Sequence, residues 1–267
     1  MRVVSALVLA AVLIPALAFN AHSRFGVVAL GLVLGAWEFS RMLDRKLAGP
    51  GAAWYAGLVV LLFILPRFPG LALPEAHWAW GVTILAVLSF TLLGFIRLAI
   101  ENMAPWIYLQ LFGCGYFGLY AAALFGLLDP VIGWKGLYPL LMIQVLIATA
   151  DTGAYLTGKA WGRRKLCPSI SAKKTVEGAA GGAALTIGMA LLLGPVLLGT
   201  GTLANLGLGM LMACTAILGD LFISVVKRYT GTKDSSQLIP GHGGVLDRFD
   251  SLLFSAPVAV FYLGWVR

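Results

Sequence analysis

The stretch that decides the fold is the run from Leu203 to Val226, LANLGLGMLMACTAILGDLFISVV. A membrane-crossing helix needs about 20 predominantly apolar residues, and this run is long enough to cross. It contains one carboxylate, Asp220. An acid inside such a helix costs about 2.5–3.5 kcal/mol on insertion scales, so intramembrane acids usually face an interior site. The stretch therefore predicts a membrane span that carries either a functional acid or a structural ion pair between Asp220 and Lys227, which shares its helical face.

Apolar runs of this kind recur along the whole chain of 267 residues. Apolar side chains make up 60% of it and charged ones 11%, whereas soluble domains have roughly 45–50% and about 25%. This composition excludes soluble, disordered, coiled-coil and collagen-like proteins. It predicts an all-α polytopic integral membrane protein with about nine transmembrane helices, within a range of 8–10. The runs lie near 3–19, 24–39, 53–65, 78–96, 106–128, 137–156, 179–198, 203–226 and 252–266.

The net charge of +8 is explained mainly by topology. With the N-terminus in the cytoplasm, fifteen of the nineteen Lys and Arg residues fall in cytoplasmic segments, as the positive-inside rule predicts. Nucleic-acid binding is therefore not needed to explain the charge. The first run could pass for a signal peptide, but an uncleaved first helix is the simpler interpretation because further spans follow it.

One integral-membrane domain, 1–267, is the economical description. No linker or repeat divides it, and we expect 1–137 to be mainly scaffold and lipid-facing helices and 138–267 to carry the catalytic helices and cytoplasmic loops. The cysteines, Cys114, Cys167 and Cys214, lie far apart and suit small buried hydrophobes better than a disulfide or zinc framework. The glycine-rich helices suggest a homodimer.

The segment from Ser224 to Asp250 follows the apolar run and is unusually rich in charge. Glycines around His242 would let the backbone approach a ligand and present N–H groups to phosphate oxygens. Asp247 and Asp250 are three residues apart, so on a helix they share a face. Two carboxylates so placed suit Mg²⁺, which commonly takes one or two carboxylates together with substrate phosphates. A solvated loop that caps two helices is the simpler alternative, but it leaves the charges unexplained.

A second polar constellation begins at the end of the span 137–156. Asp151 and Tyr155 lie four residues apart, and a basic loop follows them. The basic loop predicts a clamp for a polyanion beside the membrane, although affinity for anionic lipid headgroups explains its central arginines equally well. Gly178 and Gly182 have the GxxxG spacing typical of helix packing. The constellation also contains Lys173, Lys174, Thr175 and Glu177.

These motifs resemble those of the phosphatidate cytidylyltransferase (CDP-diacylglycerol synthase) family. The C-terminal pattern is Ser-x-x-Lys-Arg, four residues, Lys-Asp, then His-Gly-Gly-x-x-Asp-Arg-x-Asp. Its fixed positions here are Ser224, Lys227, Arg228, Lys233, Asp234, His242, Gly243, Gly244, Asp247, Arg248 and Asp250. The upstream motifs also resemble the family, with one departure: Ala172 stands where proline usually follows Ser171. The departure removes no functional group.

The resemblance implies a cytoplasm-facing enzyme of a cell inner membrane that converts CTP and phosphatidate to CDP-diacylglycerol and pyrophosphate. It implies Mg²⁺, or another divalent cation such as Mn²⁺, with room for a second ion, and dCTP as an alternative nucleotide. We expect Asp220, Asp247 and Asp250 to bind the metal, with Asp151 or Asp234 as substitutes. The expected catalytic residues are Asp220, Lys227, Arg228, Asp247, Arg248 and Asp250. The expected substrate contacts are Asp151, Tyr155, Lys173, Lys174, Thr175, Glu177, Ser224, Lys233, Asp234, His242, Gly243 and Gly244.

Two classes of alternative remain open. One is a related CTP-dependent lipid enzyme, such as an archaeal-type lipid cytidylyltransferase or a polyprenol or phytol kinase. The other is an ion-coupled transporter that uses Asp151 and Asp220. Transporter sites usually lie near the membrane midplane, whereas the charges of this chain gather at one face.

Overall fold

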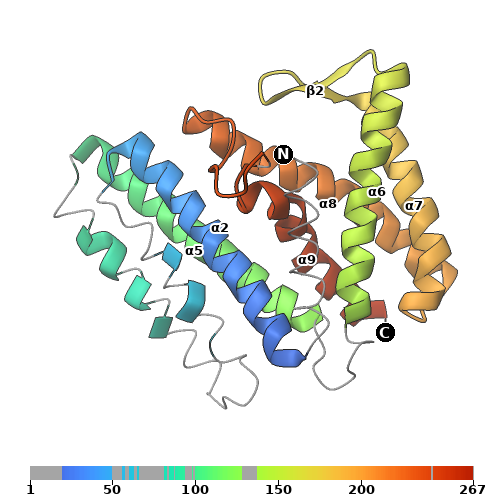
Figure 1. Cartoon of the computed structure of the whole chain (residues 1–267), viewed down its shortest axis with the longest axis horizontal. Coiled ribbons are helices and arrows are strands. Elements are labelled where there is room, and N and C mark those ends of the chain that lie inside the picture. The colour runs from blue at the N-terminus through green and yellow to red at the C-terminus, as the bar shows by residue number, and fades with distance from the viewer. Residues whose placement is uncertain are drawn as a thin grey trace. The chain divides into compact units, whose positions relative to one another are not determined.

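The chain is mostly helical in the computed structural model (Figure 1). The structure describes residues 20–49, 56–57, 60–62, 65, 81–82, 84–86, 88–93, 98, 100–127, 137–241 and 243–266. The helices are α2 (Ala21–Leu47), α5 (Ile100–Leu127), α6 (Tyr138–Trp161), α7 (Val176–Leu197), α8 (Thr202–Tyr229) and α9 (Leu246–Val266). The strands β1 (Lys165–Cys167) and β2 (Ser171–Thr175) form an antiparallel pair.

Six of the described helices are long and apolar enough to cross a membrane. They coincide with the predicted spans at 24–39, 106–128, 137–156, 179–198, 203–226 and 252–266, and confirm the class of polytopic helical membrane protein. The predicted span at 3–19 lies outside the described residues, as does about half of the span at 53–65 and part of the span at 78–96. The total of about nine spans and the cytoplasmic N-terminus stay predictions. The β1–β2 hairpin is the departure from an all-helical chain within the part that is described.

The described residues form two compact units. Unit 1 comprises the described residues within 1–125 and 229–249, and unit 2 comprises those within 126–228 and 250–267. The short segment 229–249 thus folds with helices formed much earlier in the chain. The predicted functional division at residue 137 concerns activity and stays a prediction.

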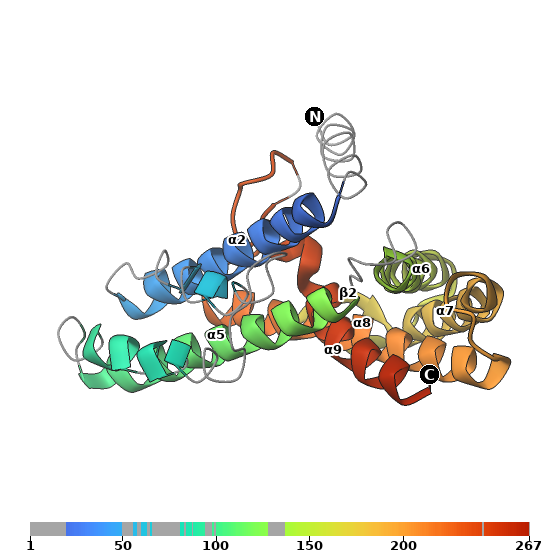
Figure 2. The same cartoon turned by 90° about the horizontal axis from the view of Figure 1, so that it is seen from below.

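In unit 1, α2 and α5 pack side by side (Figure 2). The Asn20 side chain accepts a hydrogen bond from the Ser23 backbone N–H in a capping box that starts α2. The Trp106 Nε1–H of α5 donates to the Asp44 carboxylate of α2 over 2.7 Å. The Phe39 and Phe117 rings meet edge to face, with centroids 6.0 Å apart. These contacts hold α2, which carries several of the polar side chains of unit 1, against α5.

In unit 2, α6 and α7 pack closely through their small residues. A Cβ added at Gly178 would lie 2.7 Å from the Ala154 carbonyl oxygen, and one at Gly182 would lie 2.5 Å from that of Ala150. Both separations are too short for a real side chain, so glycine permits the approach. The predicted packing role of the GxxxG pair is confirmed.

The other two helices of unit 2 are joined by polar contacts. The Ser251 hydroxyl of α9 donates to the Ala216 carbonyl of α8, and the Thr215 and Ser255 hydroxyls lie 2.9 Å apart. Gly219 allows the backbones to approach, because a Cβ there would lie 2.7 Å from the Asp250 carbonyl oxygen. This packing sets the first turns of α9 against the part of α8 that carries Asp220.

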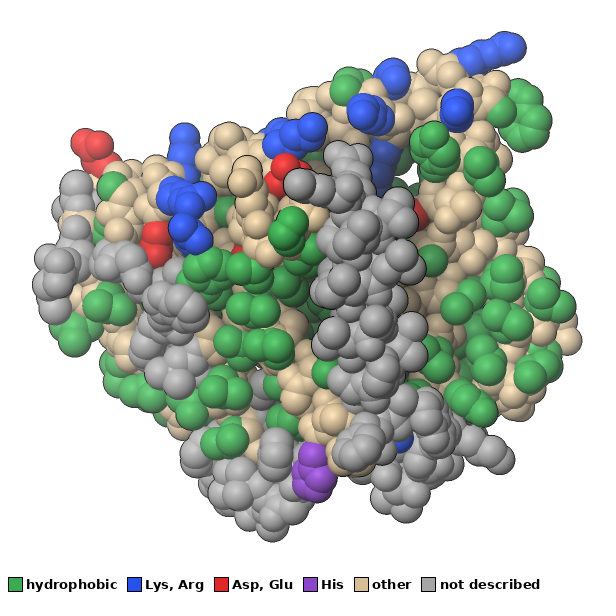
Figure 3. Space-filling view, viewed as in Figure 1, with side chains coloured by type: hydrophobic (Ala, Val, Ile, Leu, Met, Phe, Trp, Pro, Cys, Tyr) green, Lys and Arg blue, Asp and Glu red, His purple; other side chains and the backbone are tan. Residues whose placement is uncertain are grey.

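Lys and Arg side chains gather at the hairpin end of unit 2, whereas hydrophobic side chains cover the flanks of α6 and α7 (Figure 3). A lipid-exposed helix flank next to a basic end is the pattern expected where a membrane protein meets water.

Candidate active site

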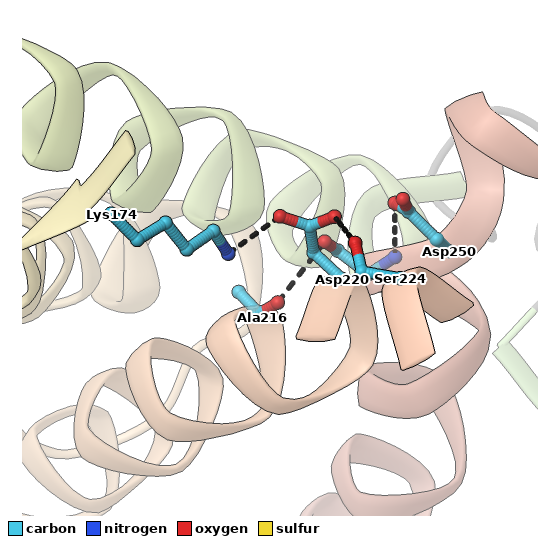
Figure 4. Close-up of polar contacts among 6 residues, drawn as sticks. Lys174, Ala216, Asp220, Ser224 and Asp250 are labelled. Carbon is cyan, nitrogen blue, oxygen red and sulfur yellow. Dashed lines mark hydrogen bonds and ion pairs between the residues drawn. The ribbon is translucent and has the colours of Figure 1, made fainter. Parts of the chain in front are cut away.

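The centre of the polar site in unit 2 is an ion pair between Lys174 and Asp220 (Figure 4). The Lys174 Nζ, from β2, lies 2.5 Å from the Asp220 Oδ2 on α8. The Ser224 Oγ, one helical turn after Asp220, donates a hydrogen bond to Asp220 Oδ1 over 3.3 Å. The hairpin therefore places a cation on the intramembrane acid that the sequence singled out.

Two further carboxylates surround this pair. Asp250, on α9, is close enough to interact electrostatically with Asp220, Asp151 and Lys227. Asp151, on α6, interacts in the same way with Lys174 and Asp220. Figure 4 shows Asp250 and Asp220 approaching from different helices. Three acids and two lysines from four elements of unit 2 thus converge, and all five are among the predicted site residues: Asp151, Lys174, Asp220, Lys227 and Asp250.

A pocket of about 200 Å³ adjoins the Lys174 side chain. Its polar lining includes Asp151, Tyr155, Lys173 and Lys174, and the Lys159 ammonium lies 5.9 Å from the centre of the Tyr155 ring. The rest of the lining is Ala150, Ala154, Leu166, Thr175, Gly178, Ala179 and Ile217. The pocket offers an anionic substrate two lysines and an apolar wall within a helical membrane protein.

Two predicted substrate residues, Thr175 and Glu177, and one predicted catalytic residue, Arg228, have structural contacts in unit 2. The Thr175 hydroxyl accepts a hydrogen bond from the Gly178 N–H and caps α7. The Glu177 carboxylate accepts hydrogen bonds from the backbone N–H groups of Arg163 and Arg164, which tie the end of α6 to the start of α7. The Arg228 Nε–H donates to the Ile170 carbonyl in the hairpin. These contacts hold the hairpin so that Lys173 and Lys174 face the pocket.

Unit 1 contains a buried polar cluster that sequence reasoning missed, centred on Glu38 of α2. The Glu38 side chain is 0% exposed. Its carboxylate accepts hydrogen bonds from Ser235 Oγ at 2.9 Å, Ser236 Oγ at 2.5 Å, Val245 N at 3.0 Å and Leu246 N at 2.7 Å. A buried carboxylate is tolerated when it is well hydrogen-bonded, and these four donors meet that need. Glu38 therefore holds the middle of the loop between α8 and α9 and the point where α9 begins.

Asp247 is tied into the same loop. Its Oδ2 accepts hydrogen bonds from the Ser235 N–H and hydroxyl and from the Gly244 N–H, at 2.9–3.0 Å. Gly243 has φ +83°, a conformation that favours glycine. A Cβ on Gly244 would collide with Ser235 and Glu38. The glycines thus serve close packing and an intramolecular N–H contact, and His242 lies outside the described residues.

The remaining predicted residues are divided between the units. Ser224 and Tyr155 belong to the site in unit 2. Lys233 and Asp234 line a separate recess in unit 1, and Arg248 is exposed in the first turn of α9. Asp220 and Asp250 belong to unit 2 and Asp247 to unit 1. The joint role predicted for these three acids in metal binding stays a prediction.

The donor chemistry of unit 2 fits a hard divalent cation. Asp151, Asp220 and Asp250 offer carboxylate oxygens, and the Lys174 ammonium already occupies a cation position on Asp220. Among the described residues, no group of three His, Cys, Asp or Glu side chains is arranged to hold a metal ion by itself. Mg²⁺ commonly needs only one or two carboxylates when substrate phosphates complete its shell.

The sequence did contain a signal for Glu38. It lies between Trp37 and Phe39 within an apolar run, as Asp220 does in its own. The rule that an acid within a membrane span needs a partner applies to both positions. The partners of Glu38 lie about 200 residues later, however, and no local pattern identifies them.

Comparisons with known proteins agree with the motifs. The model of a family described as "Cytidylyltransferase family" matches residues 1–266. A phosphatidate cytidylyltransferase of Pseudomonas aeruginosa is 36% identical over 99% of this chain and 97% of its own length. A phosphatidate cytidylyltransferase of Haemophilus influenzae is 32% identical over 99% and 98%. The Escherichia coli protein named "Uncharacterized protein YnbB" is 43% identical over 46% of this chain and 41% of its own length.

Proposed function

The chain belongs to the cytidylyltransferase family, and from this premise we propose that it makes CDP-diacylglycerol and pyrophosphate from CTP and phosphatidate. The observation that carries this proposal is the Lys174–Asp220 ion pair among further acids in unit 2. Nucleotidyl transfer needs positive charge to bind phosphate and oxygen ligands to hold a divalent cation. A lysine next to several carboxylates can supply both.

The reaction is a nucleotidyl transfer, a displacement at the α-phosphorus of CTP. The protein forms no covalent bond with either substrate in this proposal. An ionised oxygen of the phosphatidate phosphate attacks the α-phosphorus of CTP and forms a new P–O bond. The bond between the α-phosphorus and the oxygen that bridges to the β-phosphorus breaks, and pyrophosphate leaves with the electron pair. No general base is required, because the attacking oxygen carries no proton. The barrier is the approach of one anion to another, which positioned charges lower.

The residues of unit 2 divide this work. Lys173 and Lys174 hold phosphate oxygens in the pocket that they line. Lys227 and Arg228, at the end of α8, neutralise further phosphate charge. Lys174 changes partners when substrate binds, because its ammonium is held by Asp220 in the structure.

In this proposal Asp220 and Asp250 would hold a divalent cation, Mg²⁺ or Mn²⁺, and Asp247 would be the third acid. When bound, it supplies positive charge that offsets the charge of the triphosphate. Glu38 contacts neither substrate nor metal in this proposal and acts as a positioning residue. Through Ser235 and the N–H groups of Val245 and Leu246 it fixes the segment that leads into Asp247, in the first turn of α9.

The chain is a multi-pass membrane protein, and we place its site at the cytoplasmic face of a cell inner membrane. The basic hairpin end of unit 2 supports this placement through the positive-inside rule. Phosphatidate reaches the site from the bilayer and CTP reaches it from water.

The decisive experiment supplies purified full-length protein with labelled CTP and phosphatidate, with and without Mg²⁺. We expect CDP-diacylglycerol and pyrophosphate in equal amounts, and dCTP is tested beside CTP. Release of CDP with a phosphorylated lipid would identify a kinase. Uptake into sealed vesicles without nucleotide turnover would identify a transporter. Light scattering of the same preparation tests the expected homodimer.

A further inference from the structure

A polar recess of about 630 Å³ lies in unit 1. One wall is a stripe of α2, and the other is the segment that follows α8. The α2 residues Trp37, Arg41 and Arg45 are spaced four apart, so they share one helical face. The recess is lined by Trp37, Arg41, Arg45, Lys233, Asp234, Ser235, Ser236, Gln237 and Leu238.

The recess carries an excess of positive charge. Three cations line it, against the single carboxylate of Asp234. Within the described residues, Arg41, Arg45 and Lys233 form no ion pair with a carboxylate, in contrast to Lys174. Like charges four apart on a helix disfavour it by about 0.2–0.5 kcal/mol. An anion bound in the recess would relieve this repulsion.

The recess is also preorganised. The Arg41 guanidinium lies 4.8 Å from the centre of the Trp37 ring, a cation–π contact that limits its rotamers. The opposite wall is fixed to α2, because Ser235 and Ser236 both hydrogen-bond to the buried Glu38. The cations therefore face a hollow whose two sides keep a fixed spacing.

Topology alone does not account for this arrangement. The positive-inside rule asks only for Lys and Arg near a helix end. Lys46 satisfies that rule at the end of α2, and it does not line the recess. Arg41, Arg45 and Lys233 come from two segments far apart in the chain and converge on one hollow.

We propose that this recess binds a phosphate group, with Arg41, Arg45 and Lys233 as its ligands. The phosphate belongs either to a soluble polyphosphate, as in CTP and pyrophosphate, or to the headgroup of phosphatidate. Guanidinium groups bind phosphate oxygens through charge-assisted hydrogen bonds, and two arginines on one stripe can contact one phosphate group together. The inference rests on the proposed function for the choice of these two anions.

The test is calorimetric titration of full-length protein in detergent with two probes, inorganic pyrophosphate and the soluble lipid dihexanoyl phosphatidate. The variants are Arg41→Gln, Arg45→Gln and Arg45→Lys, with Lys46→Gln as the matched control. We expect each glutamine variant in the recess to weaken binding of one probe about tenfold and to reduce its salt dependence. Lys46→Gln leaves both affinities unchanged, and Arg45→Lys recovers part of the loss.

The probe that responds identifies the source of the phosphate. A shift for pyrophosphate alone assigns the recess to the nucleotide, and a shift for dihexanoyl phosphatidate alone assigns it to the lipid headgroup. The proposal is overturned if Arg41→Gln and Arg45→Gln match Lys46→Gln with both probes while all variants unfold at the wild-type temperature. Because binding is measured without turnover, a recess that binds phosphate in a chain that makes no CDP-diacylglycerol would refute the proposed function alone.

Discussion

The Lys174 ammonium lies 2.5 Å from the Asp220 carboxylate, and so joins a short hairpin strand to an acid within an apolar helix. Both side chains are partly exposed, at 25% and 31%, so the pair is open to a substrate. Under the proposed function, this ion pair holds a phosphate-binding lysine in place before the substrate arrives.

Replacement of Lys174 by Ala is expected to lower kcat/KM for CDP-diacylglycerol synthesis by about 10²–10³-fold, because a positioned charge is lost and Asp220 loses its cation. Lys174→Arg should retain part of the activity. Lys165→Ala removes the same charge from the same hairpin and lies outside the pocket lining, so it should retain near wild-type kinetics. Steady-state assays with CTP and phosphatidate varied separately check this. Equal losses for Lys165→Ala and Lys174→Ala would assign the effect to general hairpin charge.

Glu38→Ala is expected to destabilise the protein by at least about 2 kcal/mol, since it leaves four hydrogen-bond donors, three of them buried, without their acceptor. Glu38→Gln keeps one acceptor oxygen and should fall between Ala and wild type. Thermal unfolding in detergent measures both. The control is Glu101→Gln, which removes an exposed carboxylate from the first turn of α5.

A positioning role for Glu38 also predicts a kinetic effect at temperatures where Glu38→Gln is folded. We expect kcat to fall more than the KM for CTP rises, because the segment that leads into Asp247, in the first turn of α9, loses its fixed geometry. A Glu38→Gln enzyme with wild-type kcat would show that the cluster serves stability only.

Gly182→Ala is expected to destabilise unit 2 by about 1–3 kcal/mol, because its new methyl group would meet the Ala150 carbonyl at 2.5 Å and force α6 and α7 apart. Gly188→Ala on the same helix meets no atom within 4 Å. That control should be neutral or more stable by up to about 1 kcal/mol, through helix propensity alone. Unfolding temperatures of the two variants measured side by side decide the matter, and equal values would contradict close packing at Gly182.

Asp247→Asn tests the metal assignment. If Asp247 binds Mg²⁺ together with Asp220 and Asp250, the Mg²⁺ concentration for half-maximal activity should rise at least about tenfold in the variant. The same shift is expected for Asp220→Asn and Asp250→Asn. The hydrogen bonds from Ser235 and Gly244 offer Asp247 a purely structural role instead. An unchanged Mg²⁺ titration with a lowered unfolding temperature would establish that role.

The membrane helices could be predicted because the length and apolarity of a span are local properties. The second predicted span, 24–39, falls short of α2, which runs from Ala21 to Leu47. The extra turns carry Arg41, Arg45 and Lys46, and polar side chains end an apolar run without ending a helix. The backbone continues to hydrogen-bond until Ala48, where φ is +52°.

The charged residues of the site could be singled out from the sequence. The residues that each of them contacts could not. Asp151 and Asp220 could be singled out as acids at or within a span, and Lys174 as a base beside the membrane. That β2 would place Lys174 on Asp220 depends on a hairpin whose strands are too short for a clear alternating pattern. The contact between Glu38 and Ser235 spans 197 residues, and tertiary packing alone creates it.

The separation of 197 residues between Glu38 and Ser235 also means that Glu38 is synthesised well before its partner. At roughly 5–20 residues per second, about 10–40 s pass between the synthesis of α2 and the synthesis of the loop that supplies donors to Glu38. A carboxylate in a membrane helix costs about 2.5–3.5 kcal/mol while it has no partner. Throughout that interval water, lipid headgroups or a bound proton must satisfy Glu38. The earliest described helix therefore completes its packing only after the ribosome has reached the last quarter of the chain.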